Sequence, residues 1–362
     1  MHKSIFYFVL LFSCVGFSQI YEFHTIKDIE TTPVLSQDQT GSCWSFATTS
    51  FLESEIIRLT GNTVDLSEMY SVRNTYIDKA ENYVIRQGKT NFGQGGLGHD
   101  VINSIRNYGL VPQHEYIGKI NLKAQYNHDK MNAKLEAIVK KAVAKTPANY
   151  SNWKEDYLSI LDKYMGEFDK EKTLYPQQLL AFTKLNPDDY ISLTSFTNSS
   201  FYSKFILNIP DNFANGTFYN LPLDEFIQNI DNALDRGYTL TLSTDISENT
   251  FSEDKGIAVI PGNEKDWKLI ASEIKSEKEV SQEYRQSEFE NHNTTDDHLM
   301  HIVGKVVDQK GNLYYKVKSS WGTNVGKKGF YYMSVSYLRL KAICVLLHKE
   351  GLTQKTKIAL GV

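Results

Sequence analysis

The sequence predicts an α+β fold in which helical segments come first and β-strands follow. Apolar residues recur at helical spacing after Cys43 and stop at Gly61, a residue suited to end a helix. From Tyr190 onward the pattern changes to short runs that alternate between apolar and polar residues, as strands do. Between these regions, residues 119–172 are rich in Lys, Ala, Glu and Asp at helical spacing, which indicates a helical insertion.

The chain is long enough to bury a substantial core. Its 362 residues are 41% hydrophobic and 23% charged, which suits one large unit or two subdomains that share a cleft. The formal net charge is −4, so the composition does not require nucleic acid as a partner. No cluster of His, Cys, Asp or Glu has the spacing of metal ligands, and we therefore expect neither a metal nor another cofactor.

Residues 1–18 are predicted to be a secretory signal peptide. A basic start precedes a short apolar run, and the small residues Gly16 and Ser18 fit cleavage before Gln19. The apolar run is too short to span a membrane. The protein is therefore expected to be secreted or periplasmic, with residues 19–362 as its folded domain. Lipidation of Cys14 is the less favoured alternative, because the bulky and apolar residues around it do not suit a lipoprotein site.

Removal of that peptide leaves two cysteines, too few for a disulfide scaffold in a chain of this size. Cys344 lies in an apolar, strand-like run and is expected to be a buried core thiol. Cys43 instead stands where a Gly-Ser turn meets a predicted helix, whose free backbone N–H groups and macrodipole favour a thiolate. Because a thiolate is a nucleophile, this position indicates a cysteine hydrolase; a structural cysteine is the alternative.

The remaining elements follow from the same periodicities. A second helix starts near Glu68 and a third is expected at Val101–Tyr108. The glycine-rich stretch 91–100 is either a wall for an extended substrate or a tight turn before that third helix. The charged run 134–145 is interpreted as a solvated helix face. Strands are predicted at residues 238–244, 300–307, 313–318, 329–335 and 343–347, with a hairpin loop at 308–312.

Four separated motifs resemble those of the papain-like cysteine peptidases. In chain order they are Gln37 with Cys43-Trp44, the pair Gly95-Gly96, Asp297-His298, and Lys318-Ser319-Ser320-Trp321-Gly322. Thr40 stands where the papain signature has an extra cysteine, and His298 lies much farther from the nucleophile than the about 130–150 residues of that signature. Both departures resemble the bleomycin hydrolase / aminopeptidase C branch, which lacks that disulfide and carries long insertions. The resemblance spans about residues 30 to 350.

This resemblance implies a two-subdomain papain-like fold with a substrate cleft between a helical half and a β-rich half. Cys43, in the helical half, would attack the scissile carbonyl of a peptide or protein substrate. His298, in the β-rich half, would pair with the thiolate and then protonate the leaving amine. The Gln37 side chain and the backbone N–H of Cys43 would bind the oxyanion.

The walls of the cleft are implied in the same way. Gly95 and Gly96 would flank the substrate backbone, and Asp297 would also contact the substrate. Trp321 would contact the substrate as well, and it would shield the histidine from water.

Ser319 stands where the family has the asparagine that orients the histidine. A Ser hydroxyl can accept a hydrogen bond from the His298 ring, but it is a shorter arm with a freer rotor. Losing one orienting hydrogen bond costs about 1–3 kcal/mol, or one to two decades of rate. Leu299 also replaces a residue that is often small in this branch, which would narrow the cleft. The expectation is a functional peptidase with reduced activity.

Whether the C-terminal tail decides the mode of cleavage stays open. In the resembling enzymes the tail lies in the cleft and restricts cleavage to the N-terminal residues of peptides. Thr356–Val362 is small and apolar enough for that role, although a frayed chain end would look the same. The expected activity is therefore aminopeptidase-like, and an oligomer is possible because the branch often forms hexamers.

Two other functions stay open. Ser319 and Leu299 also suit a peptidase fold that binds peptide but hardly cleaves it. A transglutaminase-type acyl transferase uses a Cys-Trp pair at a helix start with His and Asp, and Asp308 follows His298 in this chain. Asp308 is expected in a hairpin loop, however, and Gln37 together with the Ser-Trp-Gly segment favours a peptidase.

Overall fold

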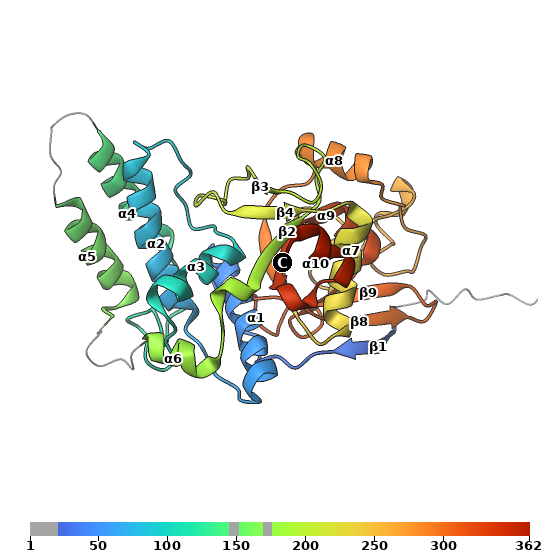
Figure 1. The fold of residues 1–362 in the computed structure, drawn as a ribbon, viewed down its shortest axis with the longest axis horizontal. Helices are drawn as coiled ribbons and strands as arrows, with labels where there is room; N and C mark the ends of the chain where they lie inside the picture. The colour runs from blue at the N-terminus through green and yellow to red at the C-terminus, as the bar shows by residue number, and fades with distance from the viewer. Residues whose placement is uncertain (1–20, 145–151, 169–175) are drawn as a thin grey trace, which may run out of the picture.

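A helical part and a β-rich part lie side by side in the computed structural model, which describes residues 21–144, 152–168 and 176–362 (Figure 1). Helices α1 to α6 form the part at the left of Figure 1, and the sheet with its covering helices forms the part at the right. The predicted α+β architecture is therefore confirmed. The predicted signal peptide and Cys14 lie outside the described residues. Within the described ranges, no helix combines the length and apolarity needed to cross a membrane.

Helix α1 (Cys43–Thr60) is the element that both parts share. It packs against α2 (Glu68–Ile85), α3 (Gly98–Tyr108) and strand β8 (His298–Asp308), and most of its side chains are buried. It ends as predicted at Gly61, which has φ 74° and donates its N–H to the carbonyl one turn earlier at 2.8 Å. Glycine adopts this left-handed conformation without steric cost, so the helix stops cleanly there.

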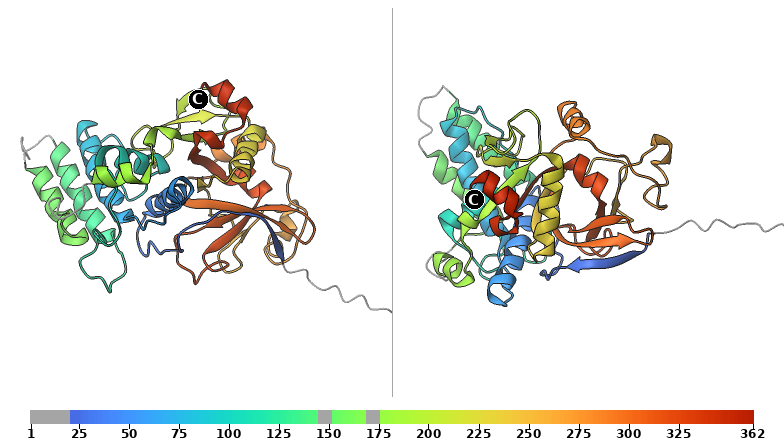
Figure 2. Two further views of the ribbon diagram at one scale, coloured as in Figure 1. Left: turned by 60° about the horizontal axis from the view of Figure 1, so that its bottom comes forward. Right: turned by 45° about the vertical axis from the view of Figure 1, so that its right-hand side comes forward.

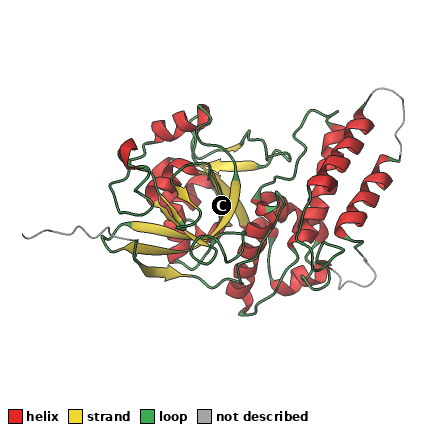
Figure 3. Ribbon diagram, turned by 180° about the vertical axis from the view of Figure 1, so that it is seen from behind, coloured by secondary structure: helices red, strands yellow, loops and turns green. Residues whose placement is uncertain are grey.

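The predicted insertion folds into helices α4 (Asp129–Val143) and α5 (Trp153–Met165), which lie with α2 in the group of helices at the right of Figure 3. Each helix buries one stripe of residues spaced by four positions. The stripes are Met131, Leu135 and Val139 on α4, and Tyr157, Leu161 and Met165 on α5. Lysines 134, 140 and 141 are exposed, so this part of the charged run is the solvated face that the sequence predicts.

The β-rich part is built on one sheet of eleven strands within the described residues. The order across the sheet is β3-β4-β2-β11-β5-β8-β9-β10-β7-β6, and β1 pairs with β8 beside this path. Besides β8, the strands are β1 (Phe23–Asp28), β2 (Tyr190–Thr194), β3 (Lys204–Ile206), β4 (Thr217–Asn220), β5 (Leu240–Thr244), β6 (Phe251–Ser252), β7 (Ile257–Ala258), β9 (Leu313–Lys318), β10 (Phe330–Ser334) and β11 (Ala342–His348).

Strand β8 carries the predicted base at its first position. Its start pairs with β5, where His298 lies opposite Thr244, and its later residues pair with β1 and β9. The predicted hairpin loop joins β8 to β9, with Gly311 at φ 86°. Strand β1 was not predicted, because its residues are mostly exposed and show no extended apolar alternation.

Five helices accompany the sheet or lead into it. They are α6 (Pro176–Thr183), α7 (Leu223–Asp235), α8 (Gln282–Glu290), α9 (Val335–Lys341) and α10 (Gln354–Leu360). Short 3-10 helices occur at Pro187–Asp189, Glu264–Asp266 and Lys349–Gly351. Figure 2 shows α7 and α10 close together in both views, and the Asn229 amide donates to the Thr356 hydroxyl at 2.9 Å across them. One apolar core fills the helical part, and a second lies between the sheet and α7.

A buried polar cluster joins α1 to the sheet behind the predicted site. The Lys318 ammonium donates to the Ser50 hydroxyl and to the Thr32 carbonyl, both at 2.7 Å. Glu53 accepts from the Thr32 hydroxyl at 2.5 Å, and His301 Nδ1 lies 2.9 Å from the Ser50 hydroxyl. Burial raises the pKa of Glu53 to about 7 and lowers that of Lys318 to about 8. These bonds hold β9 against α1 immediately before the segment that contains the predicted orienting residue.

Candidate active site

Cys43 opens α1 as a free, half-buried thiol. Burial raises its pKa to about 12, and the backbone N–H groups of Leu299 and Trp44 act in the opposite direction by interacting with the sulfur. Leu299 directly follows His298 in β8. The interaction between the sulfur and the Leu299 N–H therefore places the start of strand β8, which carries the predicted base, beside the predicted nucleophile.

The predicted glycine wall lies against the start of α1. The Trp44 indole donates to the Gln94 carbonyl at 3.0 Å, and a Cβ on Gly96 would lie only 3.0 Å from the Trp44 ring. On the other side, the buried Lys79 ammonium donates to the Gly95 carbonyl and to the carbonyl two residues earlier. The loop leads directly into α3, so the two interpretations of this stretch, a wall and a turn, describe the same segment.

His298 is 4% exposed, and its ring packs on Trp321 with 4.5 Å between ring centroids. Trp321 packs in turn against Phe251 and Tyr331, which fixes the indole over the imidazole. Burial lowers the pKa of His298 to about 3, so the isolated ring is neutral. Its Nε2 atom is enclosed and has no hydrogen-bond partner among the described residues. Trp321 thus covers the histidine as predicted, but the ring lacks an orienting bond on this nitrogen.

Ser319 supplies no such bond. Its hydroxyl oxygen is also enclosed and, in the part of the chain that the structure describes, also unpartnered. The sequence expectation that the Ser hydroxyl accepts from the ring is therefore not met. The physical reason is that the side chain of serine is shorter than that of asparagine and does not reach the ring.

Hydrogen bonds of its backbone and side chain hold Gln37 at the entrance to α1. Its backbone N–H donates to the Ser320 carbonyl at 2.8 Å, and its Oε1 accepts from the Ser320 hydroxyl at 2.6 Å. Its Nε2 donates to the Thr40 carbonyl at 2.6 Å. A primary amide carries two N–H bonds, so one remains for an oxyanion. The side chain is buried, which limits its freedom before substrate arrives.

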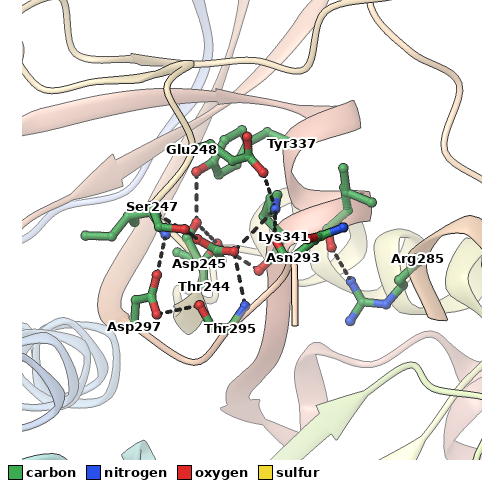
Figure 4. A network of polar contacts seen from close by, with 12 residues as sticks. Thr244, Asp245, Ser247, Glu248, Arg285, Asn293, Thr295, Asp297, Tyr337 and Lys341 are labelled. Carbon is green, nitrogen blue, oxygen red and sulfur yellow. Dashed lines mark hydrogen bonds and ion pairs between the residues drawn. The ribbon is translucent and has the colours of Figure 1, made fainter. Parts of the chain in front are cut away.

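Asp297 takes part in the polar network of Figure 4. Its carboxylate accepts from the Thr295 hydroxyl at 2.7 Å and from the Ile246 N–H at 3.4 Å. Burial and the neighbouring Asp245 carboxylate raise the pKa of Asp297. Asp245 in turn pairs with the fully buried Lys341 at 3.3 Å. These contacts fix the loop that delivers His298, whereas none of them involves the glycine wall; substrate contact by Asp297 stays a prediction.

Two carboxylates that sequence reasoning missed lie next to the nucleophile. The Asp211 carboxylate covers Gly95 so closely that a Cβ there would lie 2.2 Å from an oxygen. Asp296 accepts from the Ser243 hydroxyl at 2.5 Å through Oδ1. Both negative charges raise the pKa of Cys43. Neither residue belongs to the four motifs, so the sequence carries no signal for their place beside the nucleophile.

A cavity of about 520 Å³ opens beside Asp296. Its wall includes Phe289 from α8 and Ile209-Pro210, the two residues that precede Asp211. The loop that carries Asp211 and the loop that carries Asp296 therefore border the same space.

Comparison with known proteins agrees with this geometry. Residues 160–361 match the Peptidase C1-like family, and residues 21–165 match the papain family of cysteine proteases. Aminopeptidase G of Lactobacillus delbrueckii subsp. lactis is 23% identical over 376 residues, which cover 90% of this chain and 83% of that protein. The mitochondrial cysteine proteinase 1 of Saccharomyces cerevisiae is 23% identical over 363 residues, covering 87% and 74%.

A solved structure has a similar fold. The crystal structure of PepW from Lactobacillus rhamnosis superposes with a TM-score of 0.75 at 19% identity, covering 93% of this chain and 84% of that one. The chain belongs to the Peptidase C1-like family and is a cysteine-type peptidase of the bleomycin hydrolase / aminopeptidase C branch with a papain-like fold.

Proposed function

We propose that this peptidase removes N-terminal residues from peptides, with Cys43 as nucleophile and His298 as acid and base. The observation that carries the proposal is the Leu299 N–H at the Cys43 sulfur, since it implies that the base lies beside the first turn of α1. Aminopeptidase G, similar over most of both chains, supports the aminopeptidase mode.

In the proposed reaction, the Cys43 thiol transfers its proton to the His298 imidazole and the sulfur bonds to the scissile carbonyl carbon. The carbon–nitrogen bond breaks as the imidazolium gives that proton to the leaving amine. A water molecule then loses a proton to the imidazole and attacks the thioester, which releases the acid product and restores the thiol. Burial disfavours each charged group alone, so the ion pair forms only when sulfur and ring meet.

The negative oxygen of each tetrahedral intermediate would be bound by the Gln37 amide and the backbone N–H of Cys43. The fixed Gln37 side chain supports this role, because a donor that is already oriented loses no freedom during the reaction.

The activity is proposed to be reduced. His298 Nε2 and the Ser319 hydroxyl are each enclosed without a partner among the residues described. An unoriented ring spends less time aimed at the sulfur and at the leaving amine, which lowers the rate of both proton transfers.

A second candidate, a protein that binds peptide and hardly cleaves it, is favoured by the same two unpartnered atoms. The transglutaminase alternative has less support. Asp308 accepts the backbone N–H groups of Lys310 and Asn312 at 2.8 and 2.9 Å, and so closes its own hairpin loop rather than orienting His298.

Secretion and assembly are parts of the proposal that rest on sequence alone. Cleavage before Gln19 would be visible as a mature protein that begins at that residue when the chain is expressed with its leader. Light scattering of that product would report whether it forms an oligomer.

Turnover of an unblocked and an N-blocked peptide amide tests the proposed function. Cys43→Ala should lower turnover by about 10⁵-fold or more, since no nucleophile remains. Cys344→Ala is the matched control, because it removes the other described thiol, which is buried in β11, and should leave the rate within about threefold. Activity that survives Cys43→Ala would refute the nucleophile. A wild type that binds the peptide amide but does not cleave it would favour the second candidate.

A further inference from the structure

The Asp211 and Asp296 carboxylates have no role in the chemistry proposed above, although both act on the Cys43 sulfur. Each negative charge raises the pKa of that thiol, which works against a nucleophile. A peptidase that keeps two such groups at its cysteine needs them for another purpose, or needs a positive group that offsets them.

Asp211 presents its carboxylate at the glycine wall. Both its oxygens lie within 2.3 Å of the position that a Gly95 Cβ would occupy, so this glycine is what makes room for the carboxylate. No described residue donates a hydrogen bond to these oxygens. Lys79 is the nearby positive charge, and its ammonium already donates to the carbonyls of Gly93 and Gly95. The carboxylate therefore keeps its capacity to accept hydrogen bonds from a bound molecule.

One carboxylate oxygen of Asp296 lacks a hydrogen-bond donor. Its Oδ1 accepts from the Ser243 hydroxyl, but its Oδ2 is enclosed and no described group donates to it. Burial, with Asp211 as the next cause, raises the pKa of Asp296 to about 7. A buried carboxylate oxygen without a donor is costly, and proteins rarely keep one without a use for it.

The C-terminal tail does not explain the two carboxylates. Helix α10 ends at Gly361 with a left-handed cap, and the Val362 N–H donates back to the Lys357 carbonyl at 3.2 Å. Its side chains bond to α7 and to the preceding 3-10 turn, through Lys355 to Glu225 and Lys357 to Glu350. The described contacts of the tail thus lie on the covering helices of the sheet, and the negative charge beside Cys43 comes from the two aspartates.

We propose that Asp211 and Asp296 bind the α-ammonium group of the substrate's N-terminal residue, an inference that rests on the proposed function. In an N-terminal residue, the ammonium nitrogen and the scissile carbonyl carbon are separated only by the α-carbon. A nitrogen that delivers this carbon to the Cys43 sulfur must therefore lie close to the sulfur, where both aspartate charges act. The three N–H bonds of an ammonium group can satisfy both carboxylates, including Asp296 Oδ2.

The cavity beside Asp296 gives the substrate class a further property. Because Ile209, Pro210 and Phe289 line it, the space next to the proposed ammonium site suits an apolar side chain. The preferred substrate is accordingly a peptide with a free amino terminus and an apolar first residue.

The test compares two substrates that differ only in the amino group, alanyl-coumarylamide and propanoyl-coumarylamide. Wild type should prefer the alanyl substrate. Asp211→Asn and Asp296→Asn, each nearly isosteric, should lower kcat/KM for the alanyl substrate by about 30-fold or more, as expected when one partner of a desolvated charge pair is removed. Neither should lower the propanoyl rate by more than about threefold. Asp188→Asn is the matched control, because it removes the charge of a side chain that is 79% exposed in its ion pair with Arg106.

A second measurement separates this inference from misfolding and from failure of the proposed function. Iodoacetamide should label Cys43 faster in both variants than in wild type, because each lost charge lowers the thiol pKa, whereas a misfolded cleft would not keep this selectivity over Cys344. An unchanged ratio of alanyl to propanoyl rates in the variants would overturn the ammonium site. So would a wild type that cleaves both substrates equally, although the peptidase itself would then stand. A wild type that cleaves neither would refute the proposed function instead.

Discussion

The two sides of the candidate active site differ in how completely their polar groups are paired. On the cysteine side, Trp44, Gln37 and the glycine wall are fixed by hydrogen bonds that reach across loops. On the histidine side, His298 Nε2 and the Ser319 hydroxyl face no described partner, although the strand that carries the ring is firmly paired. The comparison teaches that a strand can place a catalytic ring without orienting it, because orientation depends on one side-chain bond.

Removing a hydrogen-bonded side chain on the cysteine side should have the largest effect. Gln37→Ala removes the proposed oxyanion donor and the bonds to Thr40 and Ser320, and should lower kcat by about 10²–10³-fold. KM should change little, since the donor acts mainly on the intermediate. Steady-state kinetics with an unblocked peptide amide checks this, and a loss below about tenfold would remove Gln37 from the oxyanion site.

Adding the missing hydrogen bond on the histidine side should have the next largest effect. Ser319→Asn provides an amide oxygen that reaches the His298 ring, and should raise kcat by about one to two decades. Ser319→Ala is the matched control and should stay within about threefold of wild type, because the hydroxyl it removes has no described partner. A tenfold loss in Ser319→Ala would mean that the hydroxyl does orient the ring. An unchanged rate in Ser319→Asn would locate any slowness elsewhere.

The protonation of Asp296 should also affect stability. The pKa of Asp296 is raised from 3.8 to about 7, so folding favours its protonated form and this contribution is lost as pH rises through that range. Asn at this position does not titrate. Asp296→Asn should therefore gain stability relative to wild type by roughly 1 kcal/mol per pH unit between these two values. Urea unfolding at several pH values measures it, and a constant difference would contradict a buried, proton-binding Asp296.

Local chemistry explains which parts could be predicted from sequence. The ends of α1, the β8–β9 hairpin and the helical character of the insertion are each determined by neighbours within a few residues, and each was predicted. Strand β1 and helix α7 were missed, because an exposed edge strand has little apolar pattern and because the region around α7 was interpreted as uniformly β.

The site residues also differ in whether local sequence could identify them. The motifs indicated Gln37, Cys43, His298 and Trp321, since each stands in a recognisable local setting. Asp211 and Asp296 could not be found in that way. Their position beside the sulfur depends on two loops from distant parts of the chain that border one cavity. The unformed bond of Ser319 was anticipated only as a weakness, because reach is a property of the folded geometry.

The two carboxylates beside Cys43 have a consequence for the lifetime of the enzyme. Burial, to which both negative charges add, keeps the sulfur protonated and makes it a poor target for peroxide, which attacks thiolates. A bound ammonium group would offset those charges and create the reactive thiolate only when a substrate is present. For the proposed secreted enzyme, which no intracellular thiol-reducing system would renew, this arrangement would conserve the nucleophile between encounters with peptide.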